Sequence, residues 1–163
     1  MKRRLAILTL TTLALVAFIG VASAAPSLAG GANQISGVGF FDEGDTCESG
    51  SVGADFALIM TGDLEGCLYT FVKTAESSPS GTYRETGREL FVASDGTSSF
   101  ATTYRFEGKY EDVDNLIREI FGRCQHPIVE GSGTGIYEGF TGRLAFKDDV
   151  EAGNFVYRGH LRW

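Results

Sequence analysis

The sequence predicts an all-β protein, an eight-stranded antiparallel up-and-down barrel, with a β-sandwich as the alternative. Apolar residues recur in short runs, several of which alternate with polar residues as in a strand with one buried face. Helical periodicity is almost absent, and short connectors rich in turn residues favour sequential hairpins over crossover helices. Eight such strands in about 130 residues can close into a barrel, whose interior is filled by side chains or holds one small ligand.

The first 24 residues have the composition of a secretory signal peptide. Three basic residues at 2–4 precede an apolar run over 5–21, and residues 22–24 (ASA) supply the small residues of a cleavage site. Cleavage after Ala24 predicts a secreted or cell-envelope protein that is no longer attached to a membrane. The alternative is that the apolar run stays as an uncleaved anchor.

The remaining 139 residues suit one domain. Residues 25–33 are small and turn-rich, which predicts a flexible leader before a single barrel domain over 34–163. Loss of the signal peptide removes three basic residues and no acidic one, leaving 11 Lys and Arg against 21 Asp and Glu and a net charge of −10. Such a surface repels phosphate, so neither nucleic acid nor an anionic membrane is an expected partner. The oligomeric state stays open.

Eight runs supply the strands, in chain order at 34–41, 55–61, 66–74, 82–93, 99–110, 116–129, 141–149 and 154–162. Turn residues separate them, as in TGD after the second run, SSPSG after the third, SDGT after the fourth and EAGN before the last. The run at 99–110 alternates most clearly, which predicts one buried face made of Phe100, Thr102, Tyr104, Phe106, Gly108 and Tyr110. Residues 114–119 fit either a helical turn or a strand, and we expect the strand.

Three cysteines are present in a chain that we expect to be exported, where a disulfide can persist. Cys67 and Cys124 lie in apolar strand-like runs, whereas Cys47 lies in the acidic segment DEGDTCESG. We therefore expect a Cys67–Cys124 bridge. Spacing does not determine connectivity, so Cys47 could pair with either of the others.

The glycine-rich run GSGTGIYEGFTGR, residues 131–143, resembles neither a phosphate loop nor a catalytic turn in its details. A phosphate loop needs a Lys and a hydroxyl residue at the start of a helix, and a dinucleotide fingerprint needs a βαβ unit. The nucleophile elbow of hydrolases needs a serine where this run has Tyr137. We expect the glycines to permit tight bends and close strand approach.

The segment VEGSGTGIYEGFTGRLAF resembles the pattern G-[ST]-G-x-[FYL]-x-G-x-[TR]-G that precedes the last strands of allene oxide cyclase-like barrels. That group is similar to plant allene oxide cyclases and dirigent proteins and includes exported bacterial proteins. The resemblance extends over residues 120–161, and LEGCLYTFV and TTYRFEGKY also resemble segments of the bacterial members. It implies an antiparallel barrel with an interior cavity. No functional residue of those families matches a position here, so no activity is implied.

Tyr104, Phe106 and His126 are the candidate ligand-contacting residues; no catalytic residue is assigned. Cys124 and His126 share a strand face, but a nucleophilic pair needs a free thiol and a zinc site needs three or four ligands. The sequence has only two histidines, so we expect a structural His126, no metal and no cofactor.

Charged residues elsewhere are expected to face solvent. Arg158, His160 and Arg162 alternate along the last run and are expected outward, although an inward set could bind a carboxylate. The acidic clusters at 42–48, 112–114 and 148–151 lack the spacing of an EF-hand and are expected to be solvated loops.

Three functions are compatible with these features of the sequence. The first is non-catalytic binding of a small apolar or aromatic ligand inside the barrel. The second is a structural module of the cell envelope or the secreted fraction, without a ligand. The third is a cyclase or isomerase that shapes a reactive substrate with polar groups such as His126, Tyr104 and Glu107. An open apolar cavity would favour the first, a large exposed apolar patch the second, and inward polar groups with perturbed pKa values the third.

Overall fold

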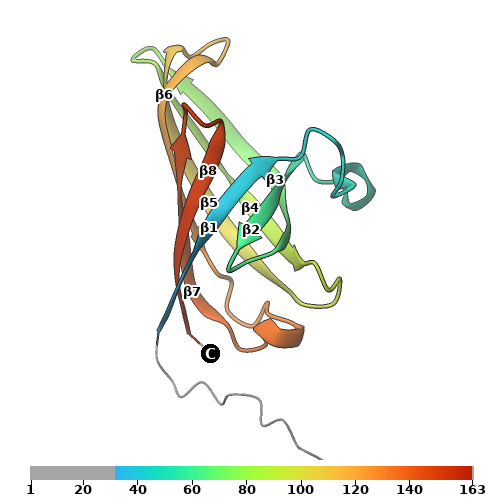
Figure 1. Cartoon of the computed structure of the whole chain (residues 1–163). Helices are drawn as coiled ribbons and strands as arrows, with labels where there is room; N and C mark the ends of the chain where they lie inside the picture. The colour runs from blue at the N-terminus through green and yellow to red at the C-terminus, as the bar shows by residue number, and fades with distance from the viewer. Residues whose placement is uncertain (1–31, 163) are drawn as a thin grey trace, which may run out of the picture.

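The computed structural model describes residues 32–162, which form a closed antiparallel barrel of eight strands (Figure 1). The strands are β1 (Asn33–Phe41), β2 (Phe56–Gly62), β3 (Gly66–Ser78), β4 (Thr82–Ala93), β5 (Ser99–Asp112), β6 (Ile117–Pro127), β7 (Thr141–Asp149) and β8 (Asn154–Arg162). Two short 3-10 helices, η1 (Ser49–Val52) and η2 (Gly135–Tyr137), lie between strands. The predicted barrel is confirmed, and the sandwich alternative is wrong.

The predictions for residues 1–31 are not tested by the structure, which begins at residue 32. The expected signal peptide at 1–24, its cleavage after Ala24 and residues 25–31 of the expected leader lie outside the described residues. None of the helices within 32–162 has the length and apolar character needed to cross a membrane.

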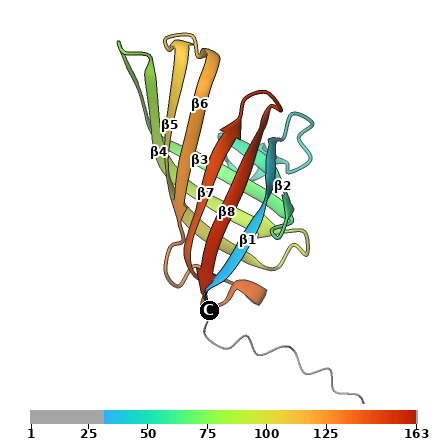
Figure 2. The same cartoon turned by 60° about the vertical axis from the view of Figure 1, so that its left-hand side comes forward.

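The barrel has two different ends. Each strand pairs with its neighbours in the chain, and β1 closes the barrel against β8. The β1–β2, β3–β4, β5–β6 and β7–β8 connections therefore share one end, which we call the mouth; the β3–β4 and β5–β6 hairpins reach furthest there (Figure 2). The other connections lie with η2 and the C-terminus at the opposite end, which we call the closed end.

Alternation decides which side chains enter the barrel. On β5, Phe100, Thr102 and Tyr104 are buried while Thr103 and Arg105 are exposed, as the sequence pattern predicts. Residues 113–116 form a turn and β6 begins at Ile117, so the strand expected at 116–129 is confirmed only from Ile117, and the alternative of a helical turn over 114–119 is wrong.

Aromatic side chains fill the closed end. Tyr137, in η2, is buried, and its ring centroid lies 5.8 Å from that of Phe91, 5.2 Å from that of Phe100 and 4.9 Å from that of Phe140. This cluster plugs the barrel at this end.

The glycine-rich run makes this plug possible. Gly135 has a φ of +61°, and a Cβ at this position would lie 2.4 Å from Ser98 Oγ, so any larger residue would push η2 away from the barrel. Gly142 has a φ of +124°, and its Cβ would lie 2.1 Å from the His160 carbonyl oxygen. The run is a bend that permits close strand approach, as predicted.

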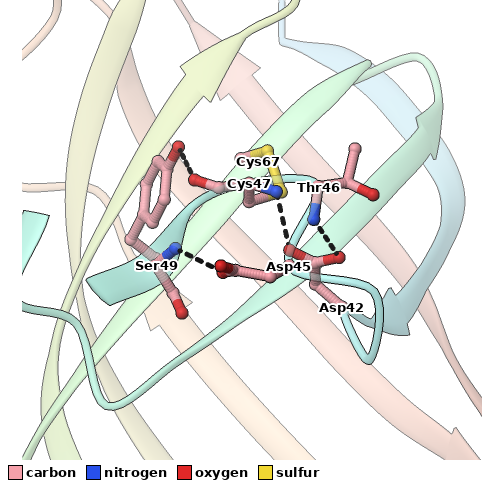
Figure 3. Close-up of a disulfide and its surroundings, with 7 residues drawn as sticks. Asp42, Asp45, Thr46, Cys47, Ser49 and Cys67 are labelled. Atoms are coloured by element: carbon pink, nitrogen blue, oxygen red, sulfur yellow. Dashed lines mark hydrogen bonds between the residues drawn. A yellow bond between two sulfur atoms is a disulfide. The ribbon is translucent and has the colours of Figure 1, made fainter. Parts of the chain in front are cut away.

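The disulfide joins Cys47 to Cys67, so the expected Cys67–Cys124 bridge is wrong (Figure 3). The reason is that the side chains of Cys67 and Cys124 lie on opposite faces of the barrel wall. Leu68 points into the core, so its neighbour Cys67 points outward, whereas Cys124 is buried on the inner face of β6. Two cysteines whose Cβ atoms point to opposite faces of the barrel wall cannot be bridged without movement of the backbone.

The Cys47 loop crosses the outer face of β3 and is shaped by local hydrogen bonds. The Asp42 carboxylate accepts hydrogen bonds from the backbone N–H groups of Thr46 and Cys47, at 2.8 and 2.7 Å (Figure 3). The hydroxyl of Tyr69 donates to the Cys47 carbonyl oxygen at 2.8 Å. Asp42 therefore belongs to a structured loop rather than to a merely solvated cluster.

Several polar residues face outward. Arg158, His160 and Arg162 are exposed on β8, as predicted. Glu107 pairs with Arg84 at 3.1 Å and Arg123 at 2.9 Å on the outer surface, so it cannot act inside the barrel as the enzyme hypothesis supposed.

Candidate ligand-binding cavity

A cavity of about 230 Å³ lies in the half of the barrel nearer the mouth and receives side chains from all eight strands. Phe41 and Leu116 flank its opening and are about half exposed, at 53% and 46%. Eight of its seventeen lining residues are Phe or Tyr, among them Tyr83, Phe106 and Phe146. Such a chamber, apolar with a few polar groups, is typical of small-molecule sites.

The three candidate residues of the sequence all lie on the wall of this cavity. Tyr104 and Phe106 come from β5, and His126 comes from β6. The His126 ring lies close to both Tyr104 and Phe146, with ring centroids 6.1 and 4.3 Å away. Alternation accounts for the inward direction of all three.

Glu89 and His126 form a buried pair in this wall. The Glu89 carboxylate Oε2 lies 2.5 Å from His126 Nδ1, and the two side chains are each 4% exposed. The hydroxyl of Thr102 also donates to Oε2 at 2.7 Å, and that of Thr70 donates to Oε1 at 3.4 Å. Three donors therefore meet one carboxylate, which satisfies the rule that a buried charge is paired.

The pair leaves one ring nitrogen of His126 available. Nε2 is buried and has no hydrogen-bond partner among the described residues. Because Nδ1–H donates to Glu89, a neutral ring presents the lone pair of Nε2, and a charged ring presents Nε2–H. Nε2 is thus an unpaired acceptor or donor on a residue that lines the cavity.

A second carboxylate, Glu85, holds two phenols. The Tyr83 hydroxyl donates to Oε2 and the Tyr104 hydroxyl donates to Oε1, each at 2.5 Å. Burial, followed by these hydrogen bonds to Glu85, raises the pKa of both tyrosines above the ordinary value. Both phenols therefore stay protonated, and each donates its one hydroxyl hydrogen to Glu85.

A third polar feature is the carboxyl pair Glu119 and Asp148. Asp148 is only 8% exposed, so the expectation that it belongs to a solvated acidic loop is wrong. Burial, followed by its hydrogen bond to Glu119, raises the pKa of Asp148 to about 8. At neutral pH the pair thus retains a proton, because two adjacent carboxylates cannot both ionise easily.

Glycines make room for this carboxyl pair. Gly122 on β6 faces Gly108 on β5, and a Cβ on Gly122 would lie 2.1 Å from the Asp148 Oδ2 and 2.2 Å from the Glu119 Oε1. An alanine at Gly122 would displace both carboxyl groups.

Cys124 lies on the inner face of β6 as a buried free thiol. Burial, followed by the nearby charge of Glu89, raises the pKa of this thiol well above its ordinary value. The thiol is therefore kept protonated, which is unsuited to a nucleophile or a metal ligand. Within residues 32–162, no three His, Cys, Asp or Glu side chains are grouped so that they could hold a metal ion.

Four inward carboxyl residues were not predicted from the sequence: Glu85, Glu89, Glu119 and Asp148. A signal existed for three of them, because Glu85 and Glu89 share strand parity with Phe91, and Asp148 shares it with Phe146. An acidic residue in line with buried aromatic residues indicates an inward carboxyl group. Glu119 gave no such signal, because a bulge after Lys109 sets it opposite Tyr110 and breaks the alternation of β6.

Comparison with known proteins adds no assignment. No family model matches the chain, and no curated protein and no solved structure matches it either.

Proposed function

We propose that this protein binds one small, mainly apolar or aromatic molecule in the mouth half of its barrel without changing it chemically. The observation that carries the proposal is the cavity of about 230 Å³ with aromatic walls. Pockets for drug-sized ligands have volumes of roughly 300–1,000 Å³, so this smaller chamber suits a compact molecule of up to three fused rings.

The polar groups of the cavity would orient such a molecule. The Glu89–His126 pair provides one hydrogen-bonding position, the unpaired Nε2 of His126, while rings such as Phe106 and Phe146 provide contact area. Buried polar groups of this kind discriminate strongly between ligands, because a ligand that lacks the matching group leaves them unpaired.

Two sequence features support this proposal and its setting. The resemblance of residues 120–161 to allene oxide cyclase-like barrels implies a cavity-forming member of that superfamily. The signal-peptide pattern of residues 1–24 implies export, and the Cys47–Cys67 disulfide is compatible with a location outside the cytoplasm.

Titration with 1-aminoanthracene, a neutral fluorescent aromatic probe, tests the binding function. We expect a saturable rise in fluorescence with one site per chain. Leu58→Trp fills the cavity wall and should weaken binding at least tenfold, whereas Val156→Trp, on the outer face of β8, should leave it unchanged. Circular dichroism checks that both variants fold, and Cys124→Phe serves as a second cavity-filling variant if Leu58→Trp does not.

Two results would count against the proposal: absence of saturable binding, or probe binding that is the same in folded cavity-filling variants and in Val156→Trp. Absence of binding would leave the ligand-free structural module as the better interpretation.

A cyclase or isomerase is the second candidate, and the free Nε2 of His126 favours it. In this function Nε2 would accept a proton from the substrate, and the Glu89 carboxylate would stabilise the imidazolium that forms. The cavity would hold the substrate in the reactive shape and exclude water.

Hydrogen–deuterium exchange at carbon tests this candidate without knowledge of the substrate. Phenylacetone in D₂O is followed by NMR, and an active Nε2 should accelerate loss of the protons next to its carbonyl group. His126→Gln should abolish the acceleration, whereas His160→Gln, on the exposed face of β8, should retain it. Exchange no faster than in buffer would remove this candidate.

A further inference from the structure

The charged side chains that line the cavity are acidic. Four carboxyl groups line it, those of Glu85, Glu89, Glu119 and Asp148. Within the described chain, no Lys or Arg side chain lines it, and His126 is the only residue there that can become a cation. An anionic ligand would therefore meet repulsion from every side of the chamber.

Two of these carboxyl groups are already matched by the protein. Glu89 accepts hydrogen bonds from His126, Thr70 and Thr102, and both oxygens of Glu85 accept from tyrosines. The other two, Glu119 and Asp148, have no match from the protein apart from the proton that they share. The Oε1 of Glu119 and the Oδ1 of Asp148 are buried and have no donor among the residues described.

Burial of an unmatched carboxyl group is costly, and Asp148 is more than nine-tenths buried. A shared proton is one way to reduce that cost, and a bound cation is another. Because both residues line the cavity, a cationic group of a ligand could reach them from the chamber.

Aromatic rings stand beside the unmatched pair. Tyr110 lies opposite Glu119 in the sheet, and its ring is 6.3 Å from the ring of Tyr83, which in turn is 6.2 Å from that of Phe106. The carboxyl groups of Glu119 and Asp148 both help to raise the pKa of Tyr110, after burial, so they lie near its ring. Ring faces attract cations through their quadrupole, most strongly where water is excluded.

We propose that the ligand is a small amine, whose ammonium group binds between Glu119 and Asp148 beside the Tyr83, Phe106 and Tyr110 rings while its apolar body fills the chamber. This inference rests on the proposed binding function and names the ligand class for the same site. It needs no metal or cofactor and no covalent step.

The raised pKa of Asp148 gives the proposal a second observable. The ammonium group favours the ionised carboxylate, so it lowers the pKa of Asp148 from about 8 and expels the proton at pH 7. Binding of a neutral analogue leaves the proton in place. The proton count therefore distinguishes a cation held at this pair from one held elsewhere.

Three matched indoles test the charge preference: tryptamine with an ammonium group, tryptophol with a hydroxyl and indole-3-acetate with a carboxylate. Each is titrated against the full-length chain by calorimetry at pH 7 in two buffers with different ionisation enthalpies. We expect tryptamine to bind at least tenfold more tightly than tryptophol and to release protons, and indole-3-acetate not to bind.

The double variant Glu119→Gln/Asp148→Asn should lose both the preference and the proton release while it still binds tryptophol. Asp149→Asn is the matched control, because its side chain faces outward on the same strand, and it should behave as the wild type.

The results with 1-aminoanthracene and with the three indoles distinguish failure of this inference from failure of the proposed binding function. If 1-aminoanthracene binds but tryptamine does not bind more tightly than tryptophol, the cationic ligand class is wrong and the binding function stands. The inference also fails if the double variant keeps the tryptamine preference. If 1-aminoanthracene does not bind either, the proposed function itself is wrong.

Discussion

The protonation of Asp148 is tied to folding. Its pKa is raised to about 8 by burial and by Glu119, whereas an Asp in an unfolded chain has an ordinary value near 3.8. The folded protein therefore binds a proton that the unfolded chain has already lost over the range between these values. The resulting stability is fully present below about pH 4 and declines as the pH rises toward 8.

We expect Asp148→Asn to flatten this dependence. Each proton bound only by the folded state changes the free energy of unfolding by about 1.4 kcal/mol per pH unit, so the wild type should lose stability from pH 5 to pH 8 relative to the variant. Urea unfolding at pH 5, 6.5 and 8 measures this difference. Asp149→Asn, on the outer face, is the control, and equal slopes in all three proteins would contradict the assignment.

Glu89 and His126 show how residues far apart in the chain become one unit. They are separated by 37 positions and meet across β5, which lies between their strands and places Thr102 beside Glu89. Neither side chain by itself indicates more than a structural role. Their contact orients the imidazole ring through Nδ1 and leaves Nε2 as its one unpaired nitrogen. This arrangement is the chemical basis for the candidate enzyme function.

At the scale of elements, the segment between β1 and β2 depends on its attachment to β3. It contains η1 and no buried residue within that helix, so little apolar burial stabilises it. Its main constraints are the hydrogen bonds of Asp42 and the Cys47–Cys67 disulfide, which closes a loop with a sequence separation of 20. A cross-link of this span stabilises chiefly by restricting the unfolded chain.

Removal of the disulfide by Cys47→Ser/Cys67→Ser should lower the free energy of unfolding by roughly 3 kcal/mol, the loss expected for a loop of about this length. Guanidinium unfolding under non-reducing conditions measures the loss. Cys124→Ala leaves the bridge intact and should keep the sensitivity of stability to dithiothreitol, which the double variant should lack. Thiol counting on the denatured, unreduced wild type should find one free thiol, and a count of three would disprove the bridge.

At the scale of the whole molecule, closure of the barrel depends on Tyr157. Gly37 on β1 faces this residue, and because Gly37 has no side chain, the phenol passes over β1 toward β2. Its hydroxyl accepts a hydrogen bond from the Leu64 N–H at 2.8 Å and donates to the Thr61 carbonyl oxygen at 3.0 Å. One side chain from β8 thus connects the closing seam to the β2–β3 turn.

Tyr157→Phe should therefore cost about 1–3 kcal/mol, because it leaves the buried Leu64 N–H without its partner while the ring still fills its space. Thermal and urea unfolding report the change. Tyr69→Phe removes a hydroxyl that bonds only to the outer loop and should cost less. A larger loss for Tyr69→Phe would show that the seam does not depend on the Tyr157 hydroxyl.

The sequence by itself determined the class and most of the elements of this protein. The ranges predicted at 82–93, 141–149 and 154–162 coincide with β4, β7 and β8. The inward direction of Tyr104, Phe106 and His126 and the bend at 131–143 were also predictable. These features are local: alternation has a period of two along one strand, and glycine conformations depend on adjacent residues.

The tertiary structure alone decided which of these residues meet. The partner of Cys67, the Glu89–His126 contact and the inward turn of Glu119 at a bulge all depend on strand register and on closure of the sheet. Register is set by packing of the whole barrel, and the sequence of a single strand does not specify which strands pair with it. The chain therefore encodes its strands in nearby residues, whereas the chemistry of its cavity exists only once β1 pairs with β8.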